Sequence, residues 1–419
     1  MSKSSPVDCC SGHTSGLLGV QEARTRMLAA VSPVGGVEQL TLRDALDRIL
    51  AEDVVSGLDV PPFANSAMDG YAVRSADCAD TAGVELTVVG SSFAGSPYGG
   101  EVGTGQAVRI MTGAVMPDGA DAVVMQERVE RDGDRVRFDG GSVKQGLNVR
   151  YAGEDLKTGD TVLEAGKRLA AADLGLLASL GIGEVRVKRR LRVAFFSTGD
   201  ELRGVGEALE KGQIYDSNRY ILHGLLNQAG IDLIDMGVIP DDRQAVRDAF
   251  QQASAMADAL VTSGGVSVGE ADFVKETLDE LGQVDFWKIA IKPGKPLAFG
   301  TINDAVFFGL PGNPVSVMAT FYQFARPALR KMMGETPGEP LVMRVPCTET
   351  LRKAPGRMEF QRGRLARDER GQWVVHSTGL QGSHVLSSMS RANCFILLAA
   401  ESSGVEAGGL VEVQPFCGL

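Results

Sequence analysis

The chain has 419 residues, far more than the about 150 residues of an ordinary domain, so we expect two to four domains. Apolar residues make up 44% and charged residues 23% of the chain, which is typical of a folded globular protein and excludes a disordered or fibrous one. Acidic residues outnumber basic ones by 53 to 42, and this net charge of −11 argues against a nucleic-acid-binding surface.

Glycine is the unusual component of the composition. The chain has 52 glycines, whereas an average abundance of about 7% predicts roughly 29. Such an excess indicates many tight turns, or backbone that approaches a ligand closely.

Neither export nor a membrane anchor is indicated. The N-terminal segment lacks the apolar core of a signal peptide, and no stretch approaches the roughly 20 apolar residues of a membrane span, so we expect a cytoplasmic protein. The six cysteines and four histidines are dispersed and form no CxxC motif, which disfavours a zinc site and predicts free thiols.

The first part of the chain is predicted to contain two helices and a small β domain. Apolar residues recur at helical spacing in 21–31, and 41–53 opens with Thr41 and Asp44 in a variant of the capping box. From about 60 to 150, short β-rich runs alternate with Gly and Asp-Gly turns. This texture indicates a β domain inserted after the helices.

A further helix over 171–180, closed by Gly181, leads into a regular alternation of strands and helices. Such alternation predicts a parallel sheet with helices on both faces, whose ligands bind beyond the carboxyl ends of the strands. The expected strands are 192–197, 231–239, 257–265, 284–293 and 305–312, and the expected helices begin near Ser217 or cover 242–257, 272–281 and 314–333.

After a turn-rich linker that ends at Pro340, short strands predict a separate β barrel or sandwich. The chain is therefore predicted to be a multidomain α/β protein with a three-layer α/β domain, a mainly parallel sheet, an inserted β domain, a helical and β entry region and a C-terminal β barrel or sandwich. The expected boundaries are 1–17 for a flexible tail, 18–59 and 150–188 for the entry region, 60–149 for the inserted domain, 189–335 for the α/β domain and 336–419 for the barrel.

Four predicted strand ends carry loops rich in glycine, hydroxyl groups and acids. The strongest physical signal is Thr262-Ser263-Gly264-Gly265, because small residues let successive backbone N–H groups face a phosphate. Gly-rich turns also occur without ligands. No GxxxxGK[ST] motif and no GxGxxG after a strand is present, which disfavours an ordinary NTPase or dinucleotide-binding protein.

Three lysines lie in the segment WKIAIKPGKPLAFG. Lys288 and Lys292 would share one face of an extended strand, and two cations on an interior strand need an anion. Lys295 lies between Pro293 and Pro296, which stiffen its turn. A solvated pair at a strand end is the alternative interpretation.

Acidic residues gather at the same predicted edge of the sheet. Glu201, Asp241, Asp242 and Asp272 follow strands, and Asp155 lies in the segment RYAGED. A divalent cation would relieve their mutual repulsion, since Mg²⁺ takes one or two carboxylates together with phosphate oxygens. Asp242 and Asp272 could equally be helix caps.

Three further motifs have a structural explanation beside a functional one. Asn313-Pro314 is typical of a helix start, with Asn at the N-cap and Pro at the first position, and a helix start favours anions. The segments 65–72 and 111–114 border predicted strands of the inserted domain and could each be plain turns.

Eight segments, in order, resemble the molybdopterin molybdenumtransferase family, the bacterial molybdenum insertases related to the gephyrin E domain. They are NSAMDGYAV, RIMTGAVMP, RYAGED, STGDEL, YDSN, SGGVSVGEADF, KPGKPLAFG and GLPGNPVSV. The resemblance runs from about residue 18 to 419 and leaves the extension before Leu17 unexplained. It implies a molybdopterin-binding α/β domain within the division given above, and a homodimer whose cleft combines this domain with the inserted domain of the partner.

The implied reaction is the insertion of molybdate into the dithiolene of adenylylated molybdopterin, with Mg²⁺ and release of AMP. Asp69 and Thr112 would reach the site across the dimer interface. By position, the implied catalytic residues are Asp69, Thr112, Asp155, Glu201, Asp241, Asp272, Lys288 and Lys292, with Glu201, Asp241 and Asp272 as metal ligands. The residues implied to bind phosphate, pterin or oxyanion are Arg150, Ser263, Gly264, Gly265, Ser267, Lys295, Pro311, Asn313, Pro314 and, on shorter motifs, Arg362, Ser383 and Ser388.

Three other functions remain to be weighed. A molybdopterin adenylyltransferase would use a similar α/β domain, but the inserted domain and the barrel argue against it. A non-catalytic scaffold of the gephyrin type does not need the acids and lysines of the site, and a generic nucleotide-binding protein does not explain SAMDGYAV. The resemblance also implies partners, namely the adenylyltransferase that supplies the substrate and downstream proteins that use the cofactor or attach a nucleotide to it.

Overall fold

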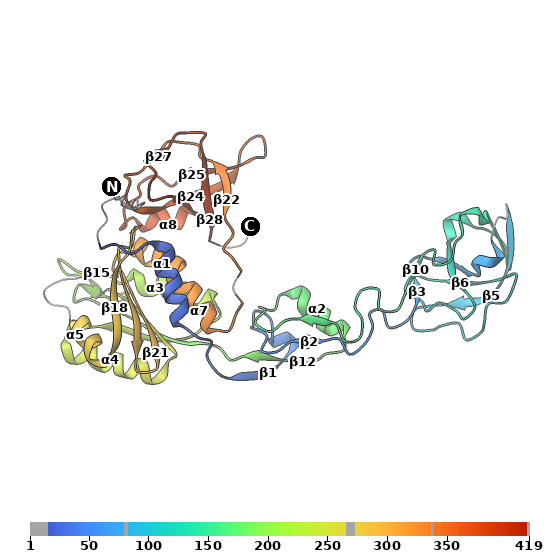
Figure 1. Cartoon of the computed structure of the whole chain (residues 1–419), viewed down its shortest axis with the longest axis horizontal. Coiled ribbons are helices and arrows are strands. Elements are labelled where there is room, and N and C mark those ends of the chain that lie inside the picture. The colour runs from blue at the N-terminus through green and yellow to red at the C-terminus, as the bar shows by residue number, and fades with distance from the viewer. Residues whose placement is uncertain (1–15, 79–82, 265–272, 337, 417–419) are drawn as a thin grey trace, which may run out of the picture. The chain divides into compact units, whose positions relative to one another are not determined.

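The computed structural model describes residues 16–78, 83–264, 273–336 and 338–416, which divide between two compact units (Figure 1). Unit 1 comprises residues 1–38, 47–49 and 188–419, and unit 2 comprises residues 39–46 and 50–187, within those described ranges.

The centre of unit 1 is a six-stranded sheet in the order β16–β13–β17–β21–β20–β18. Neighbours among the first four strands are parallel, whereas β20 is antiparallel to both of its neighbours, β21 and β18. The mainly parallel sheet expected from the sequence is thus confirmed. The strands are β13 (Arg192–Thr198), β16 (Asp232–Ile239), β17 (Ala259–Ser263), β18 (Gly282–Lys288), β20 (Pro296–Ile302) and β21 (Ala305–Leu310).

Helices cover both faces of this sheet because its strands send alternate apolar side chains into two cores. Along β13, Val193 and Phe195 join the core that includes α1, α3 and α7, whereas Ala194 and Phe196 join the core that includes α4 and α5 (Figure 1). The three-layer arrangement is therefore confirmed. The helices are α1 (Val20–Ala30), α3 (Ser217–Gln228), α4 (Arg243–Met256), α5 (Phe273–Leu281), α6 (Pro314–Thr320) and α7 (Arg326–Met332), the last two joined by a π-helical turn, Phe321–Ala325.

The C-terminal part of unit 1 forms a β barrel. Its strands follow the order β25–β24–β26–β28–β22, and a parallel bridge between Cys347 and Val375 closes the ring. A short strand, β19, joins this sheet beside β24. The elements are β19 (Ile291–Lys292), β22 (Met343–Pro346), β24 (Met358–Arg367), β25 (Trp373–Ser377), α8 (Leu386–Arg391), β26 (Cys394–Leu398) and β28 (Leu410–Pro415).

Unit 2 contains a second six-stranded sheet, in the order β7–β4–β6–β5–β9–β8, packed on small apolar cores. Elsewhere in the unit, α2 (Ala171–Ser179) ends before Gly181, whose φ of +73° confirms the expected glycine stop. The sheet strands are β4 (Gly70–Val73), β5 (Val84–Ser92), β6 (Gln106–Ile110), β7 (Ala122–Met125), β8 (Glu130–Asp132) and β9 (Arg135–Phe138), and the short pairs are β1 (Val37–Thr41) with β12 (Glu184–Lys188), β2 (Val54–Val55) with β11 (Thr161–Leu163) and β3 (Asn65–Ser66) with β10 (Val149–Arg150).

The helix predicted over 41–53 is wrong. The segment starts as strand β1 and continues only as a single 3₁₀ turn, Leu42–Asp44. Its later backbone amides find remote acceptors instead of helical ones, because the Leu50 amide donates to Lys167 O at 2.9 Å. Tertiary hydrogen bonds thus override the local helical pattern.

The single strand predicted over 284–293 is also wrong. β18 ends at Lys288 in the α/β sheet, and β19 begins at Ile291 in the barrel sheet. The sequence prediction missed β20, which forms the hairpin with β18.

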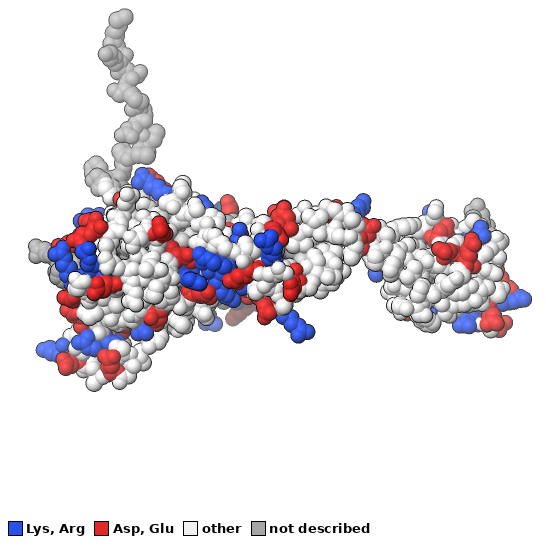
Figure 2. All heavy atoms as spheres, turned by 90° about the horizontal axis from the view of Figure 1, so that it is seen from below, with Lys and Arg blue, Asp and Glu red and all other residues white. Residues whose placement is uncertain are grey.

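The surface agrees with the acidic composition. On the face seen in Figure 2, blue basic side chains are interspersed with red acidic ones over both units. Among the described residues, no helix combines the length and the apolar character needed to cross a membrane. Cys78, Cys347 and Cys394 are buried free thiols, as the cysteine spacing predicts for them.

Candidate functional site

A cavity of about 650 Å³ lies within unit 1, where loops of the α/β sheet meet residues of the barrel. Its volume falls within the range of small-molecule sites, about 300–1,000 Å³. It is lined by Glu201, Ile214, Gly264, Lys292–Pro296, Pro311–Asn313, Ser316, Arg357 and Gln381–Ser383.

The structure brings many of the sequence-predicted site residues to this cavity. Glu201, Gly264, Lys292, Lys295, Pro311, Asn313 and Ser383 line it. Ser263 and Pro314 are chain neighbours of lining residues. Gly265, Ser267 and Asp272 lie outside the described residues.

The backbone at Gly264 explains why glycine stands at this strand end. Its φ is +92°, and a Cβ added there would lie 2.9 Å from the carbonyl oxygen of Thr198. A side chain would therefore be both strained and obstructed. The Gly264 amide donates to Leu310 O at 3.2 Å, which ties the loop after β17 to the end of β21.

Asn218 makes a second tie between these loops, and sequence reasoning gave it no role. Its Nδ2 donates to Ser263 Oγ at 2.7 Å and to Gly312 O at 2.6 Å. Two residues earlier, buried Asp216 caps α3 by accepting from the Arg219 amide at 3.1 Å. Both residues belong to the segment YDSN, one of the eight that carry the family resemblance, and this segment could have indicated their place near the site.

One side-chain oxygen of Asp216 and one of Asn218 accept no hydrogen bond from the described residues. Within the described ranges, Asp216 Oδ2 and Asn218 Oδ1 are buried and have no hydrogen-bond partner. A buried acceptor without a donor costs about 1–3 kcal/mol. Neither Asp216 nor Asn218 belongs to the cavity lining.

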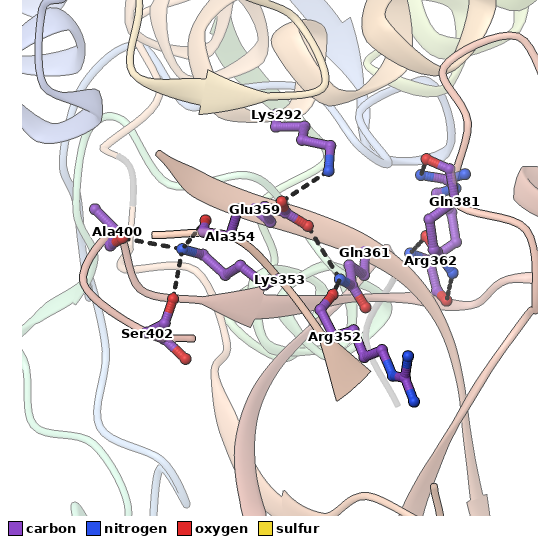
Figure 3. A network of polar contacts seen from close by, with 10 residues as sticks. All are labelled: Lys292, Arg352, Lys353, Ala354, Glu359, Gln361, Arg362, Gln381, Ala400 and Ser402. Carbon is purple, nitrogen blue, oxygen red and sulfur yellow. Dashed lines mark hydrogen bonds and ion pairs between the residues drawn. The ribbon is translucent and has the colours of Figure 1, made fainter. Parts of the chain in front are cut away.

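Three cations, Lys292, Lys295 and Arg357, line the cavity. Among the residues that the structure describes, the side chains of Lys295 and Arg357 make no hydrogen bond or ion pair. The Nζ of Lys292 instead contacts Glu359 Oε1 at 2.8 Å (Figure 3). Gly294 shapes this lysine-bearing turn with a φ of +105°, and an added Cβ would lie 2.6 Å from Thr320 Cγ2. Arg357 was missed because its segment, GRMEF, shows no distinctive pattern.

Carboxylates gather near the Glu201 side of the cavity. The Asp241 amide donates to Asp200 Oδ1 at 3.1 Å. Partial desolvation and the charges of Asp200 and Glu201 raise the pKa of Asp241 above its ordinary value. Asp242 is an N-cap, as one of its two interpretations held, because its Oδ1 accepts from the Ala245 amide at 2.9 Å. Within the described ranges, no three His, Cys, Asp or Glu side chains are arranged to hold a metal.

Arg362, which the resemblance implies as a ligand-binding residue, does not line the cavity. Its side chain is buried, and it donates to Ser388 Oγ at 3.0 Å and to the carbonyl oxygens of Leu380, Gln381 and Gly382 at 3.0–3.1 Å. Burial lowers its pKa to about 10. Arg362 therefore shapes the Gln381–Ser383 wall from behind, and Ser388 supports it.

One other expectation needs correction. Lys288 does not share a strand face with Lys292, because the two residues belong to different sheets, and Lys288 is exposed outside the cavity lining. The expected helix start is confirmed, because Asn313 is the N-cap residue of α6 and Pro314 is its first residue, although the Asn313 side chain makes no capping hydrogen bond.

In unit 2 the structure brings Asp69 and Thr112 together. Asp69 Oδ1 accepts from the Thr112 amide at 2.7 Å and from Thr112 Oγ1 at 2.8 Å. These two bonds lower the pKa of the Asp69 carboxyl below its usual value. Arg150 lies in β10 opposite Asn65, and the Asp155 amide donates to Val60 O at 2.9 Å.

Most of the chain matches known families, in three parts. Residues 18–181 match the MoeA N-terminal region (domain I and II), residues 194–331 a probable molybdopterin binding domain, and residues 344–416 the MoeA C-terminal region (domain IV). A molybdopterin molybdenumtransferase of Haemophilus influenzae is 48% identical over 96% of this chain and 99% of its own length. The chain belongs to the molybdopterin molybdenumtransferase family.

Other members of this family support the assignment. A molybdopterin molybdenumtransferase of Bacillus subtilis is 35% identical over 90% of both chains. The solved structure of the molybdopterin biosynthesis MoeA protein of Pyrococcus horikoshii matches with a TM-score of 0.83 and 32% identity, over 96% of this chain and all of that one. These matches cover the cavity-bearing unit and the inserted β domain alike.

The chemical character of the cavity suits an oxyanion or phosphate ligand. Gly264 lines the cavity without a side chain, and Lys295 and Arg357 offer positive charge that has no partner among the described residues. A site of this kind can hold an anion.

Proposed function

We propose that this protein inserts molybdate into the dithiolene of adenylylated molybdopterin and releases AMP. The observation that carries the proposal is the presence in one cavity of two cations, Lys295 and Arg357, that have no partner among the described residues. Molybdate carries two negative charges, so these cations would attract it. The same reaction type is named in the curated relatives of this family.

The proposed roles follow the positions of the side chains. Ser263 and Gly264, continued by Gly265 and Ser267, would bind phosphate and pterin. Lys292, Lys295, Arg357 and Ser383 would surround the oxyanion, since ammonium and guanidinium groups form strong charge-assisted hydrogen bonds. Pro311, Asn313 and Pro314 would shape the turn that receives the ligand.

We propose that Mg²⁺ binds at the carboxylates of Glu201 and Asp241, joined by Asp272. The donor set fits, because Mg²⁺ prefers carboxylate oxygens together with substrate phosphates. The raised pKa of Asp241 reflects partial desolvation and then the charges of Asp200 and Glu201, and a cation would relieve this repulsion. When bound, the ion would neutralise charge on the phosphate link that is cleaved. Arg150 and Asp155 remain proposed participants in the site, as does Lys288.

We further propose a homodimer in which Asp69 and Thr112 of one copy complete the site of the other. The five-part domain division and the cytoplasmic location stay part of this proposal, as do the adenylyltransferase and the cofactor-using proteins as partners.

Co-expressing an Asp69→Asn chain with a Lys292→Met chain tests the shared site. A mixed dimer would keep one intact site of two, so we expect about half of the normal activity per mixed dimer. Absence of any recovery would contradict the shared site.

The central experiment measures AMP release. The purified full-length protein is incubated with adenylylated molybdopterin, Mg²⁺ and molybdate, and active cofactor is assayed in parallel. We expect AMP release and cofactor formation that depend on molybdate, without consumption of ATP. Consumption of ATP with molybdopterin would instead support the adenylyltransferase alternative, which the full-length family matches disfavour.

A further inference from the structure

A buried carboxylate of the barrel meets the cavity lysine Lys292. Glu359 lies in β24, directly opposite Lys292 of β19 in the parallel register. It is only 4% exposed, and its Oε1 accepts from Lys292 Nζ at 2.8 Å. Its other oxygen accepts from Gln361 Nε2 at 3.0 Å (Figure 3). Both carboxylate oxygens are therefore held in place.

The neighbouring cation Lys353 does not take part in this ion pair. Its Nζ donates to the carbonyl oxygens of Ala354, Ala400 and Ser402 at 2.9–3.1 Å (Figure 3). An ammonium group has three N–H donors, so these carbonyls can occupy all of them. Within the described ranges, Lys292 is thus the cation that hydrogen-bonds Glu359.

The pair is asymmetric in exposure. The side chain of Lys292 is 48% exposed, whereas that of Glu359 is 6% exposed. One N–H of the ammonium is used by Glu359, which leaves two for a ligand in the cavity. A flexible lysine side chain loses conformational entropy when a ligand fixes it. A rigid, buried acceptor fixes the side chain before the ligand binds, so this cost does not weaken ligand binding.

The ion pair also sets the charge of the cavity. Glu359 balances Lys292, whereas Lys295 and Arg357 have no such partner among the described residues. The carboxylate of Glu201 also lines the cavity, so the lining keeps a net positive charge after Glu359 has balanced Lys292. Glu359 therefore affects both the position of one cation and the net charge that an oxyanion meets.

We infer that Glu359 is a positioning residue, which holds the Lys292 ammonium at the cavity so that its two remaining N–H groups meet the oxyanion. This inference rests on the proposed function, and neither the sequence motifs nor the family resemblance assigns Glu359 a role. Because Glu359 acts through Lys292, its effect on the reaction should vanish when Lys292 is absent.

A double-mutant cycle on the full-length protein tests this dependence. Glu359→Gln and Glu359→Asp are each made in the wild-type and in the Lys292→Met background, and AMP release and the affinity for inorganic molybdate are measured. In the wild-type background we expect each substitution to slow AMP release about tenfold, a typical coupling for residues in contact. In the Lys292→Met background we expect no further loss. Where that background leaves no measurable turnover, molybdate affinity is the readout.

A matched control separates positioning from stability. Glu335 is also a buried carboxylate, paired with Arg330 in unit 1 outside the cavity lining. We expect Glu335→Gln to lower the melting temperature and to leave AMP release within about twofold of wild type. A tenfold loss in Glu335→Gln, or an equal loss from Glu359→Gln in both backgrounds, would overturn the inference.

The two Glu359 variants also separate position from charge. Asp keeps the charge but withdraws the carboxylate by one methylene, so a purely electrostatic role would leave Glu359→Asp like wild type and overturn the positioning role. A wild-type protein that releases no AMP would overturn the proposed function instead. In that case, several-fold weaker molybdate binding by Glu359→Asp, seen only when Lys292 is present, would still support the inference, and unchanged binding would overturn it.

Discussion

The cavity of unit 1 and the Asp69–Thr112 pair of unit 2 hold their charged groups in two different ways. In unit 1, Glu359 and Arg362 are buried and bonded to groups that the fold brings from elsewhere in the chain. In unit 2, Asp69 is exposed and held by the amide and hydroxyl of a single threonine.

The difference separates residues whose removal disturbs the fold from residues whose removal disturbs only the chemistry. A buried charge that loses its partner costs several kcal/mol, whereas an exposed carboxylate on a turn can be neutralised with little loss of stability. Substitutions in unit 1 should therefore change stability and activity together, and the substitution of Asp69 should separate the two.

The largest effect on stability is expected for Arg362→Ala. The substitution leaves the carbonyls of Leu380, Gln381 and Gly382 without their donor and opens a cavity where the guanidinium lay. We expect a loss of roughly 3–5 kcal/mol in the free energy of unfolding, measured by urea denaturation. A variant as stable as wild type would contradict the assigned role of Arg362 behind the cavity wall.

Asp69→Asn should produce the opposite combination. Asn keeps the oxygen that accepts from Thr112, so we expect an unchanged melting temperature, while AMP release falls about 100-fold or more if Asp69 takes part in the reaction. Asp59→Asn is the matched control, because Asp59 Oδ1 accepts from the amide and hydroxyl of Thr158 in the same manner. Equal activity of both variants would remove Asp69 from the site.

Lys295→Ala should have a smaller and purely local effect. Lys295 has no partner among the described residues, so its loss leaves no buried charge behind, and we expect an unchanged melting temperature. We expect about tenfold weaker molybdate binding by calorimetry, the typical cost of one charge contact. Lys288→Ala should weaken binding less, because Lys288 lies outside the cavity lining; the reverse order would contradict the cavity as the oxyanion site.

The smallest expected effect concerns pH. Because the pKa of Asp241 is raised, the folded protein binds this proton more tightly than the unfolded chain does. Asp241 therefore contributes stability below its ordinary pKa, and that contribution is lost as pH rises through the raised value. If ionised Asp241 is needed for turnover, AMP release should fall on acidification at a higher pH than an ordinary aspartate would give.

Asp200→Asn tests the cause of this shift. It removes one repelling charge and keeps an oxygen that can accept from the Asp241 amide, so the acidic limb of the pH–rate profile should move to lower pH. Asp232→Asn, at the other end of β16, is the control and should leave the limb in place. An unmoved limb in Asp200→Asn would exclude Asp241 as the titrating group.

Much of the α/β domain followed from local patterns in the sequence. Helices such as α4 have a clear apolar face and a capping residue, Asp242, so their limits were predicted within a residue or two. β20 was missed because Pro296 and Gly300 suggest turns, although the segment forms a hairpin with β18. The prediction of a helix over 41–53 was wrong because backbone amides of this segment donate to carbonyl oxygens that are distant in the sequence.

Site residues could be predicted from the sequence only where the residues next to them form a distinctive motif. Gly264 and Lys295 stand in distinctive loops, and both line the cavity. Glu359 gives no such signal, because its meaning depends on Lys292, 67 residues away in the sequence. Arg362 was assigned to ligand binding because a motif does not show that its side chain is buried.

Crystals soaked with molybdate, Mg²⁺ and AMP test the central claim most directly. Anomalous scattering at the molybdenum edge identifies the oxyanion without ambiguity. The account predicts a molybdenum peak in the cavity of unit 1, within hydrogen-bond reach of Lys292, Lys295 and Arg357. A peak elsewhere, with this cavity empty, would contradict it.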